Sequence, residues 1–143
     1  MKIVIPYNND ISEPEIHYCV KLNMQLQGLE AEWVKCKEPN DYAVLINRLW
    51  KEGEVFIIIE HDVFVTRRAV ERIWECPEIF CGYNGMLTCA KIIPKDVCPV
   101  DTRTSWIFLD KELQDGLYKR GITYHDHSIE DQIINLNKEN IPK

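Results

Sequence analysis

The first part of the chain alternates short apolar runs with amphipathic stretches. Residues Lys2–Pro6 are rich in β-branched side chains and run into a polar loop, so they predict a buried strand. Ser12-Glu13-Pro14-Glu15 has the form of a capping box with proline in the first turn, and it predicts a helix that runs to Gly28. Residues 31–36 then predict a second strand. This order of elements is typical of the start of an α/β protein.

The middle of the chain continues the alternation. Asp41 is placed to cap a helix that ends at Gly53. Residues 55–59 are apolar at consecutive positions, which predicts a central strand covered on both faces, as in a parallel sheet built from β-α-β crossovers. Thr66 is a natural N-cap for a further helix, and Cys76-Pro77 ends it.

The second half is less regular. Residues Gly85–Ile93 predict another strand, and Pro94–Arg103 predicts a loop. Two helices are expected after it, over Asp110–Arg120 and from Ser128 to about Asn140, the latter opened by a capping box. The whole pattern predicts an α/β fold with a mostly parallel central sheet flanked by helices.

Composition and charge narrow the class of protein. The 143 residues are 45% apolar and 28% charged, which fits one domain over residues 1–143. The net charge of −6 argues against sequence-independent binding to nucleic acid. No apolar run is long enough for a transmembrane segment, and Pro6 interrupts any signal-peptide core, so we expect a cytoplasmic protein. The six cysteines are then expected to be reduced thiols.

Candidate chemistry gathers at Glu60-His61-Asp62, directly after the most apolar predicted strand. In open α/β sheets, ligands bind beyond the carboxyl ends of strands. Two carboxylates separated by one residue can both turn toward a hard divalent cation, which also accepts phosphate oxygens. Alternatively, Asp62 only starts a turn and Glu60 faces solvent; the sequence leaves both interpretations open.

The segment Gly53–Asp62 resembles the motif Gly-Glu-Tyr-Ile-x-Phe-Leu-Asp-x-Asp of GT-A-type glycosyltransferases, particularly the family-2-like group. Ile5-Pro6-Tyr7-Asn8 and Glu130-Asp131 are similar to two further motifs of these enzymes. The resemblance implies a GT-A/Rossmann-like nucleotide-binding core. It also implies a metal-dependent, hexosyltransferase-like glycosyltransferase that moves a sugar from a nucleoside-diphosphate sugar to a glycan, lipid or protein acceptor.

The resemblance further implies a donor site. Asp62, supported by Glu60, would bind Mn²⁺ or Mg²⁺ that bridges the diphosphate, and Pro6, Tyr7 and Asn8 would border the base and ribose. The candidate nucleotide-sugar-binding residues are Pro6, Tyr7, Asn8, Glu60, His61, Arg67 and Trp106. Trp106 is either a platform for a sugar ring or a core residue, and Arg67 either contacts phosphate or faces water.

The resemblance also implies a catalytic role for the Glu130-Asp131 pair near the end of the chain. Asp131 is the leading candidate for the general base that takes a proton from the acceptor hydroxyl, and Glu130 is next in line. Asp131 equally fits the acid of a helix capping box. His127, from the His125-x-His127 pair, is a candidate metal ligand, because some GT-A enzymes use a distant histidine there; it also fits a solvent-exposed loop.

Departures from the motif keep other functions open. Glu60 replaces the usual aspartate, and the chain is short for this fold. It therefore also fits a non-catalytic nucleotide-binding or carbohydrate-binding module, or an enzyme whose acceptor site is completed by an oligomer or a partner protein. A third alternative is a structural zinc bound by Cys76, Cys81, Cys89 and Cys98, although their spacing is wider than in most such sites.

Overall fold

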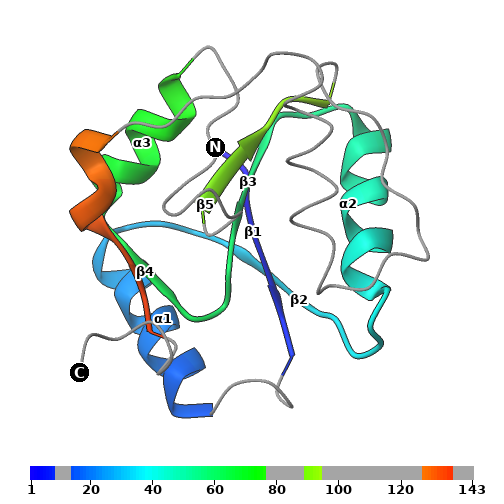
Figure 1. Cartoon of the computed structure of the whole chain (residues 1–143), viewed down its shortest axis with the longest axis horizontal. Coiled ribbons are helices and arrows are strands. Elements are labelled where there is room, and N and C mark those ends of the chain that lie inside the picture. Colours follow the sequence, from blue (N-terminus) through cyan, green and yellow to red (C-terminus); the bar gives the residue numbers. More distant parts are fainter. Residues whose placement is uncertain (9–13, 77–88, 95–126, 137–143) are drawn as a thin grey trace.

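The computed structural model of the chain describes residues 1–8, 14–76, 89–94 and 127–136. Its main sheet has four strands in the order β2-β1-β3-β5. They are β1 (Ile3–Tyr7), β2 (Glu32–Lys35), β3 (Phe56–Ile59) and β5 (Cys89–Ile92). β1 is parallel to β2 and β3, whereas β5 is antiparallel to β3 (Figure 1). The predicted α/β fold with a mostly parallel sheet is therefore confirmed, with β5 as an antiparallel edge strand.

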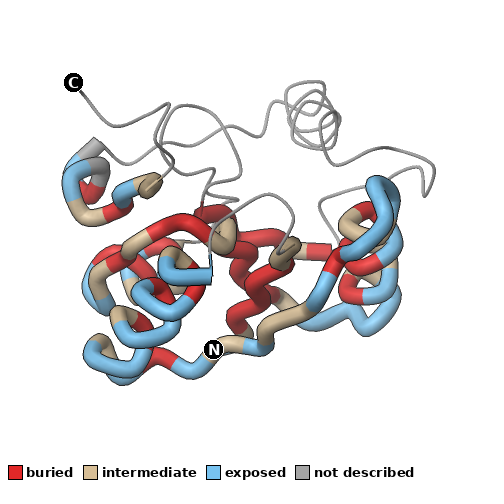
Figure 2. The backbone as a smooth tube through the Cα atoms, turned by 90° about the horizontal axis from the view of Figure 1, so that it is seen from below, coloured by how far each residue is buried: buried red, intermediate tan, exposed pale blue. Residues whose placement is uncertain are grey.

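Helices cover both faces of this sheet (Figures 1 and 2). They are α1 (Pro14–Leu26), α2 (Asp41–Glu52) and α3 (Arg67–Glu75). Successive side chains of β3 point to opposite faces: Phe56 and Ile58 pack with residues of α2, whereas Ile57 and Ile59 pack with residues of α1 and α3. This explains why β3 is apolar at every position.

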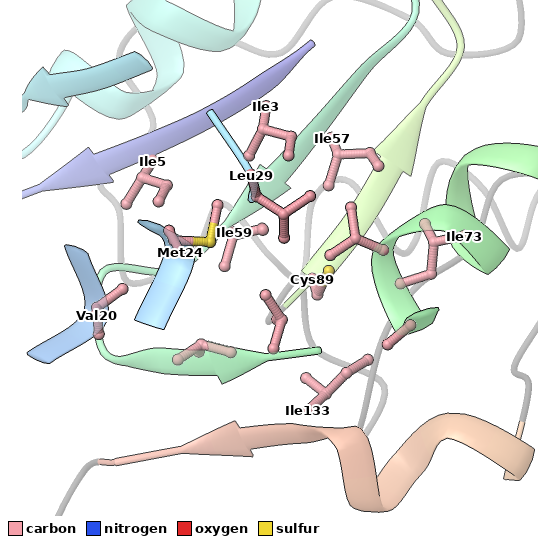
Figure 3. Packing of buried hydrophobic residues seen from close by; sticks show 14 of the residues in the cluster. Ile3, Ile5, Val20, Met24, Leu29, Ile57, Ile59, Ile73, Cys89 and Ile133 are labelled. Carbon is pink, nitrogen blue, oxygen red and sulfur yellow. The ribbon is translucent and has the colours of Figure 1, made fainter. Parts of the chain in front are cut away.

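The larger hydrophobic cluster lies on the face covered by α1 and α3 (Figure 3). Ile3 and Ile5 of β1 pack with Val20 and Met24 of α1 there. Ile73 of α3 lies at the other end of the cluster. Val20 and Met24 are four residues apart on one helix face, which is the spacing that buries an amphipathic helix against a sheet. This packing holds α1 against the parallel strands β1 and β3.

A second, two-stranded sheet was not predicted. It pairs β4 (Val63–Val65) with β6 (Ile133–Asn135) in antiparallel register. The predicted helix from Ser128 to about Asn140 is wrong, because residues His127–Gln132 form a 3₁₀ helix and β6 follows it directly. Pairing with β4 buries Ile133 in the core, and this tertiary partner decides the conformation of a short, β-branched segment.

The helix ends can be compared with the capping residues predicted from the sequence. Thr66 is the N-cap of α3, as predicted, and its side chain accepts a hydrogen bond from the backbone N–H of Ala69. Gly53 ends α2 in the left-handed conformation, with φ of 76°. Asp41 is not the N-cap of α2; the N-cap is Asn40. The Asp41 carboxylate instead accepts from the backbone N–H groups of residues 37 and 38, so it stabilises the turn before the helix.

Some predictions fall outside the described residues. They are the start of the Gly85–Ile93 strand, nearly all of the Pro94–Arg103 loop, the helix Asp110–Arg120, Trp106, Cys81 and Cys98. Among the described helices, none combines the length and apolar character needed to cross a bilayer.

Candidate functional site at the carboxyl ends of β1 and β3

The parallel strands β1 and β3 lose their pairing before they reach their carboxyl ends. Their register pairs Ile3 with Ile57 and Val4 with Ile58. The even-numbered residues of β1 face β3, because the Ile57 N–H donates to the carbonyl of Lys2. Pro6 is the next even residue and has no N–H to continue the ladder. The hydrogen-bond ladder between β1 and β3 therefore ends before the edge where Tyr7, Asn8 and the acidic triplet follow.

A cluster of aromatic and imidazole side chains lies at this edge. His61 Nδ1 and His17 Nε2, which comes from α1, are 2.8 Å apart and share a hydrogen bond. The ring of Tyr7 contacts His17 edge to face at 5.6 Å between centroids, and Trp33 of β2 lies against both rings. The predicted residues Tyr7 and His61 are thus brought together through His17.

His17 was missed by sequence reasoning, although a signal for it exists. It is only 6% exposed and stands three and seven residues before Val20 and Met24, on the buried face of α1. A histidine at a core position of an amphipathic helix needs a polar partner. The sequence cannot name that partner, because His61 lies 44 positions further along the chain.

Burial sets the protonation of this histidine pair. It lowers the pKa of His17 and the pKa of His61. The positive charge of Lys21 lowers the pKa of His17 further, whereas the negative charge of Asp62 raises the pKa of both imidazoles. Burial is the largest of these causes, so both imidazoles are neutral at neutral pH and one ring donates a hydrogen bond to the other.

Asp62 occupies the turn between β3 and β4 and is 8% exposed. Its backbone carbonyl accepts a 2.7 Å hydrogen bond from the N–H of Leu136, which fixes the turn. Its Oδ1 atom is buried and has no hydrogen-bond partner in the described part of the chain. The turn therefore does not use this carboxylate oxygen, and a buried acceptor left without a partner destabilises the protein unless a ligand or ion satisfies it.

Glu60 is half-buried and points toward the second sheet. Its Oε2 atom lies 3.5 Å from Nδ2 of Asn135 in β6. Across residues 1–8, 14–76, 89–94 and 127–136, no cluster of three or more His, Cys, Asp or Glu side chains is arranged to hold a metal ion. Within that part of the chain, a cation at Asp62 would take most of its ligands from phosphate and water, which is how Mg²⁺ is commonly bound.

Arg67 lies away from the triplet. Its guanidinium donates to the carbonyl of Gly28 at 3.0 Å and contacts Glu71 at 2.7 Å. Its backbone N–H donates to the side chain of Gln27, just past the end of α1, whereas His61 lies beside His17 near the start of that helix. The structure therefore uses Arg67 to join α1 to α3.

The Glu130-Asp131 pair lies on the 3₁₀ helix before β6. Asp131 is exposed. The next residue, Gln132, accepts a backbone hydrogen bond from the N–H of Thr66, at the end of β4 opposite to Asp62. The structure thus does not bring Asp131 beside Asp62. Glu130 and His127 belong to the same 3₁₀ helix, but their side chains, like Trp106, are outside the described part.

The cysteine residues considered for zinc are only partly described. Cys89 is completely buried in β5, and this burial raises the pKa of its thiol to about 12. A zinc ligand must be a thiolate, so the surroundings of Cys89 favour an ordinary buried thiol. Cys76 follows α3 as a free, partly exposed thiol.

Comparisons with known proteins add no family assignment. No protein-family model matches the sequence. No curated protein matches it significantly either. The function is therefore inferred from the residues at the carboxyl ends of β1 and β3.

Proposed function

We propose that this protein is a metal-dependent glycosyltransferase that binds a nucleoside-diphosphate sugar at the carboxyl ends of β1 and β3. The observation that carries the proposal is the buried Oδ1 atom of Asp62, which has no hydrogen-bond partner in the described residues. It lies in the turn directly after β3, at the edge where open α/β sheets bind ligands. Parallel β1 and β3 with helices on both faces fit a GT-A-like nucleotide-binding core.

The negative charge of the chain supports the binding of a cation at Asp62. The chain has a net charge of −6, and a diphosphate would add further negative charge beside Asp62. A Mn²⁺ or Mg²⁺ ion bound to Asp62 would offset both and would stabilise the nucleoside diphosphate as it leaves the sugar. Glu60 is close in sequence but is engaged with Asn135, so Asp62 is the main protein ligand in this proposal.

The neighbouring side chains would position the site. The bond between His17 and His61 ties the turn that carries Asp62 to α1. Tyr7 packs against His17 and provides an aromatic edge next to Asn8, at the end of β1. Neutral imidazoles leave the negative charge of Asp62 available to a cation.

The base that accepts the proton of the acceptor hydroxyl is a separate part of the proposal. Asp131 keeps this role as a prediction, although it lies apart from Asp62. Because it is exposed and on another element, Asp131→Asn should leave nucleotide binding unchanged and reduce only transfer. Loss of nucleotide binding in this variant would contradict the assignment.

A thermal-shift experiment tests the donor site. Nucleoside diphosphates are added to the full chain with Mn²⁺, with Mg²⁺ or with EDTA. We expect a rise in melting temperature that needs both metal and nucleotide, because a ligand that binds only the folded state stabilises it. Asp62→Asn should abolish the rise, whereas Glu54→Gln, which removes an exposed carboxylate ahead of β3, should keep it.

Transfer is then tested by release of the nucleoside diphosphate from a nucleotide sugar in the presence of glycan, lipid and protein acceptors. Metal-dependent release that disappears in Asp62→Asn supports the enzyme. Metal-dependent binding without any release would instead assign a binding module. A shift that is equal in Asp62→Asn and in the wild type overturns the site itself.

A further inference from the structure

Among the described strands, none pairs with the outer edge of β2, which is the last strand of the main sheet on its side (Figure 1). Cys36 donates its N–H to the carbonyl of Tyr7, and the register pairs Val34 with Pro6, so the even-numbered residues of this segment bond to β1. The N–H and C=O groups of Trp33 and Lys35 therefore point away from the sheet, where another strand could pair with them.

A groove lies between α1 and the segment that leads into β2, and it reaches Trp33 of β2. Its volume is about 350 Å³. Its lining includes Lys21, Met24, Leu29, Glu30 and Trp33. Lys21 lies over the Trp33 ring, 4.9 Å from its centroid, so one wall of the groove is aromatic and cationic.

The helix beside the groove carries exposed apolar side chains. Tyr18 is 67% exposed and Leu22 is 42% exposed. Asn23 of α1 bonds to β4 on one side of the helix, whereas Lys21 contacts β2 on the other side. Tyr18 is next to Lys21 around the helix, one turn back, so it lies on the β2 side of α1, whereas Leu22 points outward, equally far around the helix from Lys21 and Asn23.

We propose that two copies of this chain form a symmetric dimer by antiparallel pairing of their β2 strands. Only residues whose backbone groups point outward can exchange hydrogen bonds, so Trp33 pairs with Lys35 of the partner subunit and Lys35 with the partner's Trp33. Val34 then lies opposite the partner's Val34 on the two-fold axis. The two sheets become one continuous sheet, and both α1 helices lie on the same face of it.

Side-chain chemistry favours a second copy as the occupant. In this register each Lys35 lies across from a Trp33 ring, a cation and aromatic pair, and Glu30 in the groove adds a negative charge on the same side. The central pair, Val34 with the partner's Val34, adds an apolar contact on the opposite face of the sheet. A four-residue strand is too short to form a stable interface alone, because such interfaces bury roughly 1,200 Å² or more. The exposed Tyr18 of both α1 helices, together with the groove, would supply the additional area.

Light scattering coupled to size-exclusion chromatography tests the dimer on the full chain over a range of concentrations. We expect the wild type to have twice the mass of one chain. Lys35→Pro removes an N–H that points away from β1, and its ring blocks the approaching strand, so this variant should be a monomer with an unchanged far-UV spectrum. Lys35→Ala is the matched control: it loses the same ammonium group but keeps the N–H, so it should still dimerise.

The register is tested separately with Val34→Cys. Cysteines opposite each other across the two-fold axis should form a disulfide between subunits under mild oxidation, to an extent that wild-type chains with their exposed Cys19 do not reach. A monomeric wild type at every concentration overturns the proposal. So does a Lys35→Pro variant that dimerises like the wild type, or a folded Val34→Cys variant that does not cross-link beyond the wild-type level.

Discussion

At the scale of single residues, the candidate site combines a buried carboxylate oxygen without a hydrogen-bond partner in the described residues and two histidines that share a hydrogen bond. Asp62 Oδ1 is buried and accepts no hydrogen bond in the described residues, whereas His17 and His61 share one. These neighbours therefore respond in opposite ways to substitution. Removing the charge relieves a penalty, and removing one imidazole creates one.

The first prediction concerns Asp62 in the absence of metal. Asp62→Asn should raise the free energy of unfolding by about 1 kcal/mol, because a neutral amide is less costly to bury than a carboxylate whose Oδ1 atom accepts no hydrogen bond from the described residues. Urea unfolding in EDTA measures this, with Glu54→Gln as the control for loss of a negative charge. A less stable Asp62→Asn protein would show that the carboxylate has a structural partner and would weaken the metal proposal.

The second prediction concerns acid stability of the metal-free chain. Burial lowers the folded-state pKa of both His17 and His61 below the usual 6.5, so the unfolded chain binds more protons as the pH falls through that value. The free energy of unfolding should therefore be fully present above pH 6.5 and decrease below it, until the folded-state pKa values are passed.

The variant His17→Phe tests the origin of this effect. It keeps a ring of similar size and removes one of the two imidazoles, so the decrease in unfolding free energy between about pH 6.5 and 5 should become shallower. Urea unfolding at a series of pH values provides the slope for each protein. Identical slopes in wild type and variant would assign the acid sensitivity to other groups.

At the scale of elements, the contact between α3 and the segment before β6 joins distant parts of the chain. Thr66 accepts from Ala69 N–H at 3.1 Å and donates its hydroxyl proton to Oε1 of Gln132 at 2.6 Å. The same threonine thus begins α3 and holds the end of the 3₁₀ helix. The residue that caps α3 therefore also makes a tertiary contact.

The third prediction follows from this double role. Thr66→Ala should lower the free energy of unfolding by about 1–2 kcal/mol, at the upper end of the usual loss for an N-cap, because it removes both bonds. Thr66→Ser keeps the hydroxyl and should recover most of the stability. Chemical denaturation of the three proteins gives the comparison, and an unaffected Thr66→Ala protein would refute the coupling.

At the scale of the whole molecule, the main sheet divides the core into two clusters that meet in β3. Ile57 faces α1 and α3, and Ile58 faces α2; both side chains are completely buried. The two clusters share the backbone of one strand. We therefore expect the described domain to unfold as one cooperative unit.

The fourth prediction tests that unit. Ile57→Val and Ile58→Val should each lower the free energy of unfolding by about 1 kcal/mol, the usual loss for one buried methyl group, without changing the dependence on denaturant concentration. Urea titrations followed by tryptophan fluorescence and by circular dichroism should coincide. Separate transitions for the two probes would indicate that the two faces unfold independently.

Sequence reasoning was most successful where local signals and burial agree. The strand-helix order from β1 to α3 follows from periodicity, from Thr66 and from Gly53, all of which act locally. β4 and β6 were missed because each has only three residues and depends on the other for its hydrogen bonds. The site was predicted in part for the same reason: the triplet has a local signature, whereas the contact with His17 exists only in the folded chain.

The direction of β5 has a practical consequence for altering the protein. Because β5 runs against β3, its first residue, Cys89, is paired with Ile59, the last residue of β3. The chain therefore enters β5 next to the edge that bears Glu60 and Asp62. Sequence grafted immediately ahead of Cys89 would be delivered beside the acidic turn while the strand register stays intact, which makes this junction a starting point for redesigning ligand preference.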